Sequence, residues 1–197
     1  YPLSNYHSVE ERRKFKVSDV IIVGDGPAGL SAALFLAKNG QEVTVLGIDK
    51  TAMHSAKLYN YLGIPEIIGS DFQKVAKEQV QKFGAKLQNQ QVTGIEKTAN
   101  GFAVATESGE RHEGKYVIIA EGKSIKLAQS LGLTITSTGV QVDHNYRSSI
   151  ERLYVVGRST RLARSQAIIS AGTGAVAALD ILATEKGKDF VDYDTVD

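Results

Sequence analysis

The stretch that decides the fold runs from residue 19 to residue 29 and reads DVIIVGDGPAG. Its first part, Asp19–Val23, is a short continuous apolar run, typical of a strand that is buried on both faces. Its second part carries Gly24, Gly26 and Gly29 in the spacing Gly-x-Gly-x-x-Gly. A helical pattern follows, and Glu42–Leu46 then reads as a second strand. This order predicts a βαβ unit of the dinucleotide-binding kind.

The residues of this turn have separate physical tasks in a dinucleotide site. Gly24 permits the tight turn, Gly26 lets the backbone approach a pyrophosphate, and Gly29 lets the helix pack close to the strand. Pro27 and Ala28 open the helix, where proline is tolerated because its missing N–H would have no partner. The free N–H groups of a helix start attract phosphate. The alternative is a glycine turn in another α/β fold.

The rest of the chain continues the α/β pattern. We expect an α/β, Rossmann-like domain with a central parallel sheet, covering helices and an antiparallel β-meander, bounded by residues 19–187, with an N-terminal arm at 1–18 and a tail at 188–197. The elements that support this are a helix at Asp71–Phe83, a meander at Leu87–Glu113, strands at Tyr116–Ala120, Val140–Asp143 and Leu153–Val156, and a final helix at Ser165–Thr184.

Composition excludes several kinds of function. The chain has 197 residues, a formal net charge of +1 and no cysteine. We therefore expect no disulfide, no thiolate nucleophile and no thiolate metal site, and the four separated histidines predict no metal centre. The small net charge argues against a nucleic-acid partner, and we expect no apolar run long enough to span a membrane and no signal peptide. A cytoplasmic location is the resulting expectation.

Several segments together resemble the low-molecular-weight thioredoxin reductases, in the pyridine nucleotide–disulfide oxidoreductase superfamily. Gly24–Gly29 resembles the first FAD motif of that family, and Gly47-Ile48-Asp49 resembles its ribose turn. Later segments match in the same order: Tyr59–Gly63 beside the flavin, Val117–Gly122 at a strand end, Leu153–Arg158 at an apolar strand ending in Gly-Asp, and Gln166–Ala178 in the helix that closes over the flavin.

The resemblance implies FAD as the cofactor and a homodimer as the assembly. Carried over residue by residue, it implies the following FAD-binding residues: Gly24, Gly26, Pro27, Ala28, Gly29, Asp49, Lys50, Asn60, Val92, Ala120, Gly122, Gly157, Arg158, Gln166 and Ala167. It implies no certain catalytic residue. His54 is a candidate acid or base near the flavin, with a surface histidine as the alternative.

The chain also departs from the family in ways that bear on function. The family inserts an NADPH domain, with a Cys-x-x-Cys pair, where this chain has only the short stretch between Gly122 and Gly139. Arg158 stands where the family has aspartate, and Glu121 stands where it has threonine. Arg158 could abolish FAD binding or could pair with the pyrophosphate, and a solvated loop or dimer contact is the alternative.

Three functions follow from these observations. The first is a single-domain, FAD-binding oxidoreductase or electron-transfer protein without disulfide reductase activity, reduced by a partner protein and open to a small-molecule substrate. The second is a non-catalytic nucleotide-binding or regulatory module that keeps the fold. The third is an NAD(P)-binding oxidoreductase, which the flavin-closing helix disfavours.

Overall fold

The computed structural model describes residues 16–196, so most of the expected N-terminal arm lies outside the described residues. Its main sheet has the strand order β5-β2-β1-β8-β7-β6, with β11 beside β8. Four of its pairings are parallel: β1 with β2, β1 with β8, β2 with β5, and β8 with β11. These strands are β1 Lys16–Val23, β2 Val43–Gly47, β5 Lys86–Asn89, β8 Arg111–Ile119 and β11 Leu153–Val155. The α/β fold with a central parallel sheet is confirmed.

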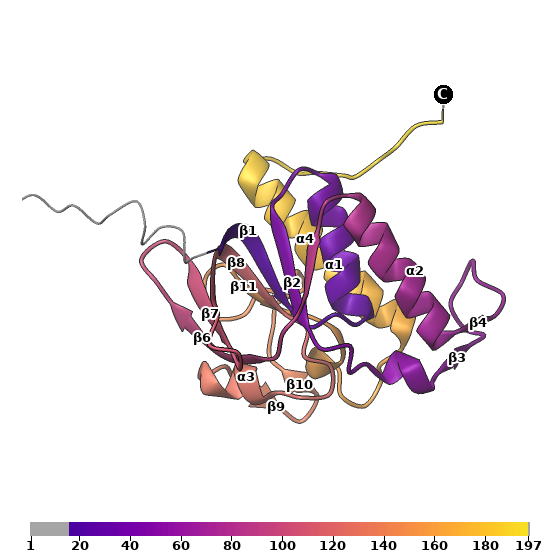
Figure 1. Ribbon diagram of the computed structural model, residues 1–197, viewed down its shortest axis with the longest axis horizontal. Helices are drawn as coiled ribbons and strands as arrows, with labels where there is room; N and C mark the ends of the chain where they lie inside the picture. Colours follow the sequence, from indigo (N-terminus) through magenta and orange to yellow (C-terminus); the bar gives the residue numbers. More distant parts are fainter. Residues whose placement is uncertain (1–15, 197) are drawn as a thin grey trace, which may run out of the picture.

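Helices cover one face of this sheet, as Figure 1 shows. They are α1 Pro27–Lys38, α2 Gly69–Lys82 and α4 Ala167–Lys186. Alternate residues of β1 point to opposite faces, so Ile22 belongs to the core under the helices and Ile21 to the core on the other face. Both side chains are fully buried, which explains the continuous apolar run that precedes the glycine turn.

The opposite face is covered by the antiparallel hairpin β6 Val92–Lys97 and β7 Phe102–Thr106, and by the short helix α3 Lys126–Ser130 (Figure 1). A small separate hairpin, β9 Ile135–Thr136 with β10 Gly139–Val140, follows α3. Helix α3 and this hairpin are the elements of the stretch between Gly122 and Gly139. The stretch is therefore a short segment that packs against the sheet, as the sequence indicated, and not a domain. The remaining short elements are η2 Ala52–Ser55, β3 Lys57–Leu58, β4 Ile67–Ile68 and η3 Gly157–Thr160.

Some boundaries differ from the sequence prediction. The first strand begins at Lys16, and its first residues pair with β8. The predicted meander at Leu87–Glu113 wrongly included β5, which pairs parallel with β2 because it ends a second β-α-β crossover through α2. The predicted strand Val140–Asp143 is reduced to the end of the β9–β10 hairpin.

Helix α4 corrects the expectation that no apolar run is long enough to span a membrane. It has 20 residues and a hydropathy of 1.6, which meet the length and composition of a spanning helix. However, Gly174, Ala177, Ala178 and Ile181 are buried in the fold. A Cβ added at Gly174 would lie 2.0 Å from the carbonyl oxygen of Ala28 in α1. The small, apolar residues of α4 therefore allow this helix to pack closely against α1.

Candidate functional site

A large hollow lies at the carboxyl ends of the parallel strands. It has a volume of about 710 Å³, within the range of ligand-binding cavities. Its wall includes the residues that follow β1, β2 and β8, namely Gly24, Ile48 and Ala120, together with Gly157 after β11. The chain leaves β1 toward β2 on one side, whereas β8 lies on the other. The cavity therefore occupies the topological switch point where open α/β sheets bind ligands.

Two of the three fingerprint glycines are required by the fold itself. Gly24 has a φ of 111°, and a Cβ there would lie 2.2 Å from the carbonyl oxygen of Ala120. A Cβ at Gly29 would lie 2.0 Å from the carbonyl oxygen of Gly24. Gly29 is buried and packs beneath the turn, so it does not line the cavity, whereas Gly24 does.

Gly26 behaves differently, because nothing in the protein requires a glycine there. Its backbone is extended, with φ −80° and ψ −175°, which any residue adopts. A Cβ at this position would meet only the side chain of Thr51, at the ordinary contact distance of 3.4 Å. Gly26 lines the cavity. The empty place beside it is the space through which a pyrophosphate would approach the backbone.

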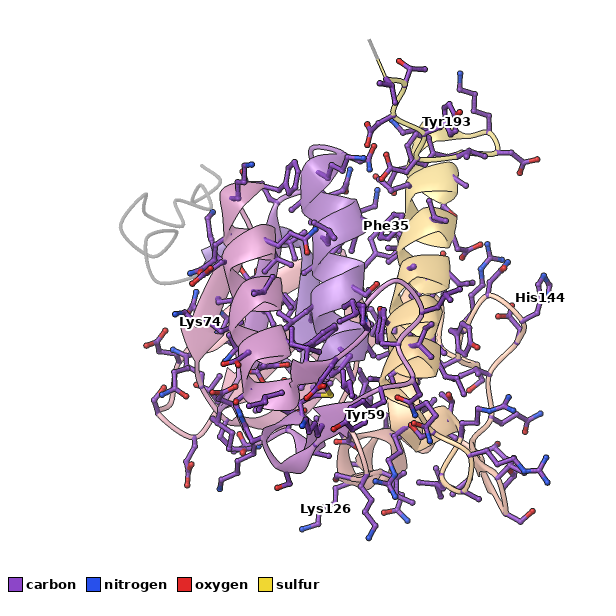
Figure 2. All side chains as sticks on the ribbon, turned by 90° about the vertical axis from the view of Figure 1, so that its right-hand side faces the viewer. Phe35, Tyr59, Lys74, Lys126, His144 and Tyr193 are labelled. Atoms are coloured by element: carbon purple, nitrogen blue, oxygen red, sulfur yellow. The ribbon has the colours of Figure 1, made fainter. Side chains whose placement is uncertain are left out.

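The starts of two long helices open onto this cavity. Gly26 is the N-cap of α1 and Gln166 is the N-cap of α4, and neither helix has a side-chain cap. Pro27, Ala28, Ala167 and Ser170, from the first turns, line the cavity as well. In Figure 2, Lys126 lies at the end of the molecule where α4 begins, opposite Tyr193. Free N–H groups and the positive ends of two helix dipoles thus face one site.

Cationic side chains add to this positive potential. Lys50, Lys123, Lys126 and Arg158 line the cavity. The Nε of Arg158 is buried and has no hydrogen-bond partner within the described residues. A buried guanidinium N–H without a partner is costly, and an anionic oxygen in the cavity would satisfy it.

Glu121 brings a carboxylate into the same cavity. Its Oε2 accepts a hydrogen bond from the backbone N–H of Leu127, at 3.2 Å, whereas its Oε1 is buried without a partner in the described part of the chain. Burial raises the pKa of this carboxyl group, and the backbone N–H groups at the start of α3 and the nearby Lys126 oppose that increase.

This raised pKa predicts a pH dependence of stability. Between the unfolded pKa, near 4.5, and the higher folded pKa, the folded protein holds the proton more tightly than the unfolded chain does. Glu121 therefore lowers the free energy of unfolding as pH rises through this window. We expect Glu121→Gln, without ligand, to become more stable than the parent as pH rises from 4.5, in urea unfolding. A constant difference across this range would contradict the assignment.

Asp49, expected to bind ribose, lies outside the lining of the cavity. Its Oδ1 is 2.6 Å from Lys77 Nζ and 3.1 Å from His54 Nε2. The hydrogen bond from Lys77 is the main cause that lowers the pKa of Asp49, and the contact with His54 acts in the same direction. His54, the candidate acid or base, is also outside the lining. The two side chains contact each other at the surface beside Lys77, while the neighbouring Lys50 lines the cavity.

Asp25 explains why a glycine stands at the end of β2. A Cβ at Gly47 would lie 2.4 Å from the Cγ of Asp25, so the Asp25 side chain occupies the space beside β2. Its Oδ2 accepts a hydrogen bond from the Asp49 N–H at 3.0 Å and lies 3.3 Å from Lys77 Nζ. The Nε2 of buried Gln73 donates to the Asp25 carbonyl. Sequence reasoning missed this role, although the charged residue inside Gly-x-Gly was the available signal.

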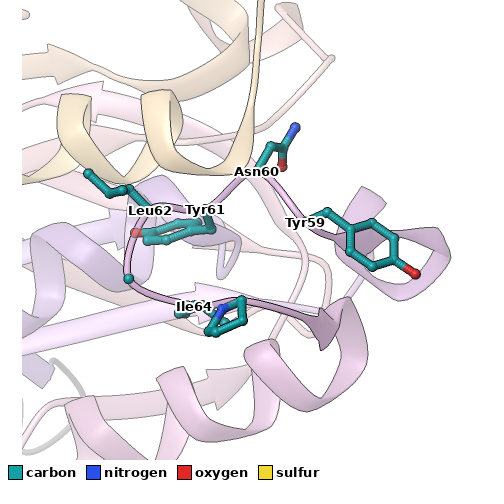
Figure 3. Close-up of a pocket in the computed structure, with 7 residues that line it drawn as sticks. Tyr59, Asn60, Tyr61, Leu62 and Ile64 are labelled. Carbon is teal, nitrogen blue, oxygen red and sulfur yellow. The ribbon is translucent and has the colours of Figure 1, made fainter.

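Asn60 lines a second hollow, of about 440 Å³, formed by Tyr59–Pro65. Figure 3 shows its side chain directed away from Tyr59. The Nδ2 of Asn60 donates to the Oε1 of Gln166 at 3.1 Å, and Gln166 lines the main cavity. The two hollows are therefore neighbours, joined by this contact.

The structure brings most of the other expected site residues together. They line the main cavity and come from segments far apart in the chain: Val92, Ala120, Gly122, Gly157, Gln166 and Ala167. The turn at Gly157, whose φ is 76°, is fixed by a hydrogen bond from its N–H to Thr173 Oγ1 in α4, at 2.8 Å. Across residues 16–196, no group of His, Asp or Glu has a metal-binding arrangement.

Comparison with known sequences connects this geometry to a family. The family described as pyridine nucleotide-disulphide oxidoreductase matches residues 2–157. The chain is 36% identical over 115 residues to thioredoxin reductase of Helicobacter pylori, covering 55% of this chain and 36% of that protein. It is 35% identical over 124 residues to ferredoxin–NADP reductase 3 of Lysinibacillus sphaericus, covering 59% and 36%. The chain thus spans about a third of the length of these curated relatives.

Solved structures share the fold at low sequence identity. A thioredoxin reductase from Gloeobacter violaceus superposes with a TM-score of 0.79 at 19% identity, covering 92% of this chain and 99% of that one. A ferredoxin-flavin thioredoxin reductase from Clostridium acetobutylicum gives a TM-score of 0.77 at 18% identity, covering 88% and 100%. The Rossmann-like arrangement predicted from the glycine turn is the fold of these proteins.

Proposed function

The chain belongs to the pyridine nucleotide-disulphide oxidoreductase family, and we propose that it is a flavoprotein that binds FAD in the cavity at the carboxyl ends of its parallel strands. The observation that carries this proposal is that the fold itself does not require a glycine at position 26. The space that the missing side chain leaves beside the backbone is the space that a pyrophosphate would fill. FAD would supply the redox chemistry, and the protein would bind and orient it.

The residues of the cavity suit a long ligand with a central double phosphate. The starts of α1 and α4 offer free N–H groups, and the unpartnered Nε of Arg158 offers a charged donor. Val92 and its neighbour Gln91 lie among the lining residues, which suits the adenine position implied by the family resemblance. Gln166, also in the lining, connects the cavity to Asn60.

We propose further that the reducing electrons come from a partner. The chain contains no cysteine, so its own residues supply no disulfide pair. The stretch from Gly122 to Gly139 folds as α3 and a hairpin, next to the cavity. A homodimer and a cytoplasmic location stay predictions from the family resemblance and the composition.

The visible absorption spectrum of the purified protein tests the cofactor assignment. We expect flavin bands near one equivalent, either as purified or after addition of FAD. A protein that is colourless after addition of FAD and removal of the unbound FAD, but that binds ADP, would favour the non-catalytic nucleotide-binding module. A protein that takes neither ligand would contradict both.

Arg158 gives a sharper prediction about the same site. We expect Arg158→Met to raise the dissociation constant of FAD by about tenfold or more, because a charged hydrogen bond to phosphate is lost. Arg158→Asp should weaken binding further, through repulsion of the pyrophosphate. Quenching of flavin fluorescence measures both. Arg161→Met is the matched control, because Arg161 is exposed and its Nε already donates to the Arg164 carbonyl. Unchanged affinity in Arg158→Met would show that Arg158 is not a ligand.

A further inference from the structure

Glu121 is the carboxylate in the cavity lining that has one oxygen without a hydrogen-bond donor in the described part of the chain. The cavity lining contains two acidic side chains, Asp25 and Glu121. The Asp25 carboxylate is already engaged by the Asp49 N–H and by Lys77. Glu121 uses one oxygen to accept from Leu127 N–H, and its other oxygen is buried without a partner in the described part of the chain.

The position of Glu121 favours a ligand. Glu121 follows the carboxyl end of β8, directly after Ala120, and both residues line the cavity. The hydrogen bond from α3 holds the carboxyl group in place, and Leu127 packs in the same core as Val92. A buried acceptor without a donor costs free energy, so it indicates a group that arrives with the ligand.

We propose that Glu121 is a cofactor-binding residue whose free carboxylate oxygen accepts a hydrogen bond from a sugar hydroxyl of the bound dinucleotide. This inference rests on the proposed function, because it assigns a contact within the same cavity. It also supplies a sugar-binding carboxylate in place of Asp49, because the carboxylate of Asp49 contacts Lys77 and His54 outside the cavity. The acceptor expected from the end of β2 is supplied instead from the end of β8.

The charges around Glu121 give the contact a recognisable pH dependence. Lys126 of α3 faces it, Lys50, Lys123 and Arg158 share the cavity, and Asp25 is paired with Lys77. An ionised carboxylate is a stronger acceptor than a protonated one. FAD affinity of the parent should therefore weaken as pH falls through the raised pKa of Glu121, whereas that of Glu121→Gln should change much less.

Titration of FAD and of ADP into four forms of the protein tests this proposal. We expect Glu121→Met to raise the dissociation constant of FAD by roughly tenfold to a hundredfold, as expected for loss of a charged hydrogen bond. The control is Ser130→Ala, which removes a hydrogen bond to the Leu127 carbonyl within α3 but does not touch the cavity. It should bind FAD as the parent does. Glu121→Gln, the fourth form, keeps an acceptor for Leu127 N–H and isolates the charge.

The two ligands identify the hydroxyl. An equal loss for FAD and ADP in Glu121→Met assigns a ribose hydroxyl, and a loss for FAD alone assigns the ribityl chain. A lower melting temperature with unchanged affinities for both ligands would show that Glu121 only holds α3, and would overturn the inference while FAD binding stands. If the parent binds ADP but not FAD, the FAD assignment fails and the ADP titration still decides the role of Glu121. If the parent binds neither, both proposals are wrong.

Discussion

Gly26→Val is expected to raise the dissociation constant of FAD more than a hundredfold and to leave the protein folded. The valine side chain would occupy the place that a pyrophosphate needs, and it would also shield the free N–H groups at the start of α1. Gly26→Ala adds only a Cβ, so its loss of affinity should be smaller, about tenfold. Equilibrium dialysis with FAD gives both values.

Retention of the fold is the second half of this prediction. The extended backbone at Gly26 accommodates a β-branched residue, and a Cβ there meets only Thr51 at 3.4 Å. Because valine is a poor N-cap, a loss of about 1 kcal/mol is expected, seen as a drop in melting temperature of roughly 2–4 °C.

Gly24→Val is the matched contrast from the same turn. Its φ of 111° is strained for valine, and its Cβ would lie 2.2 Å from a backbone carbonyl oxygen. This variant should fail to fold or should melt far below the parent. If Gly26→Val instead binds FAD as the parent does, the cavity is not the pyrophosphate site.

The sequence predicted the parts of this site that depend on local backbone chemistry. A buried strand, a glycine turn and a helix start are fixed by neighbouring residues, so β1, the turn and α1 could be derived from residues 19–38. The close agreement of Gly157, Gln166 and Ala167 with the cavity lining came from the family resemblance, which supplied contacts that no local pattern contains.

Contacts between side chains from distant segments could not be derived in this way. Asp49 stands where the resemblance to the family's ribose turn places the acidic residue, but Asp25 takes the space beside Gly47 and holds the N–H of Asp49. This contact joins a residue of the turn at the end of β1 to the residues at the end of β2, so it depends on the two strands lying side by side. Likewise, β5 is short and polar, and only its crossover through α2 distinguishes it from a strand of the meander.

The last expected result concerns the contact between α1 and α4, on which the site depends. Gly174→Leu should lower the free energy of unfolding by about 3 kcal/mol or more, or prevent folding. A Cβ at Gly174 would lie 2.0 Å from the Ala28 carbonyl oxygen and 3.1 Å from the Ala32 nitrogen, so the two helices must separate. For a domain of this size, about 3 kcal/mol corresponds to a drop of roughly 6–12 °C in melting temperature.

Gly172→Ala on the same helix is the control for this result. Nothing lies within 4 Å of a Cβ at Gly172, and replacing an exposed helical glycine by alanine should stabilise the protein by about 0.5–1 kcal/mol. A lower melting temperature for Gly174→Leu and a higher one for Gly172→Ala would establish that α1 and α4 pack too closely for any side chain at position 174. Because both helices direct their free N–H groups into the cavity, any folded Gly174→Leu protein should also bind FAD more weakly than Gly172→Ala. Equal stability of the two variants would mean that the helices can separate without cost, and the positions of both helix starts would then not be fixed by their packing.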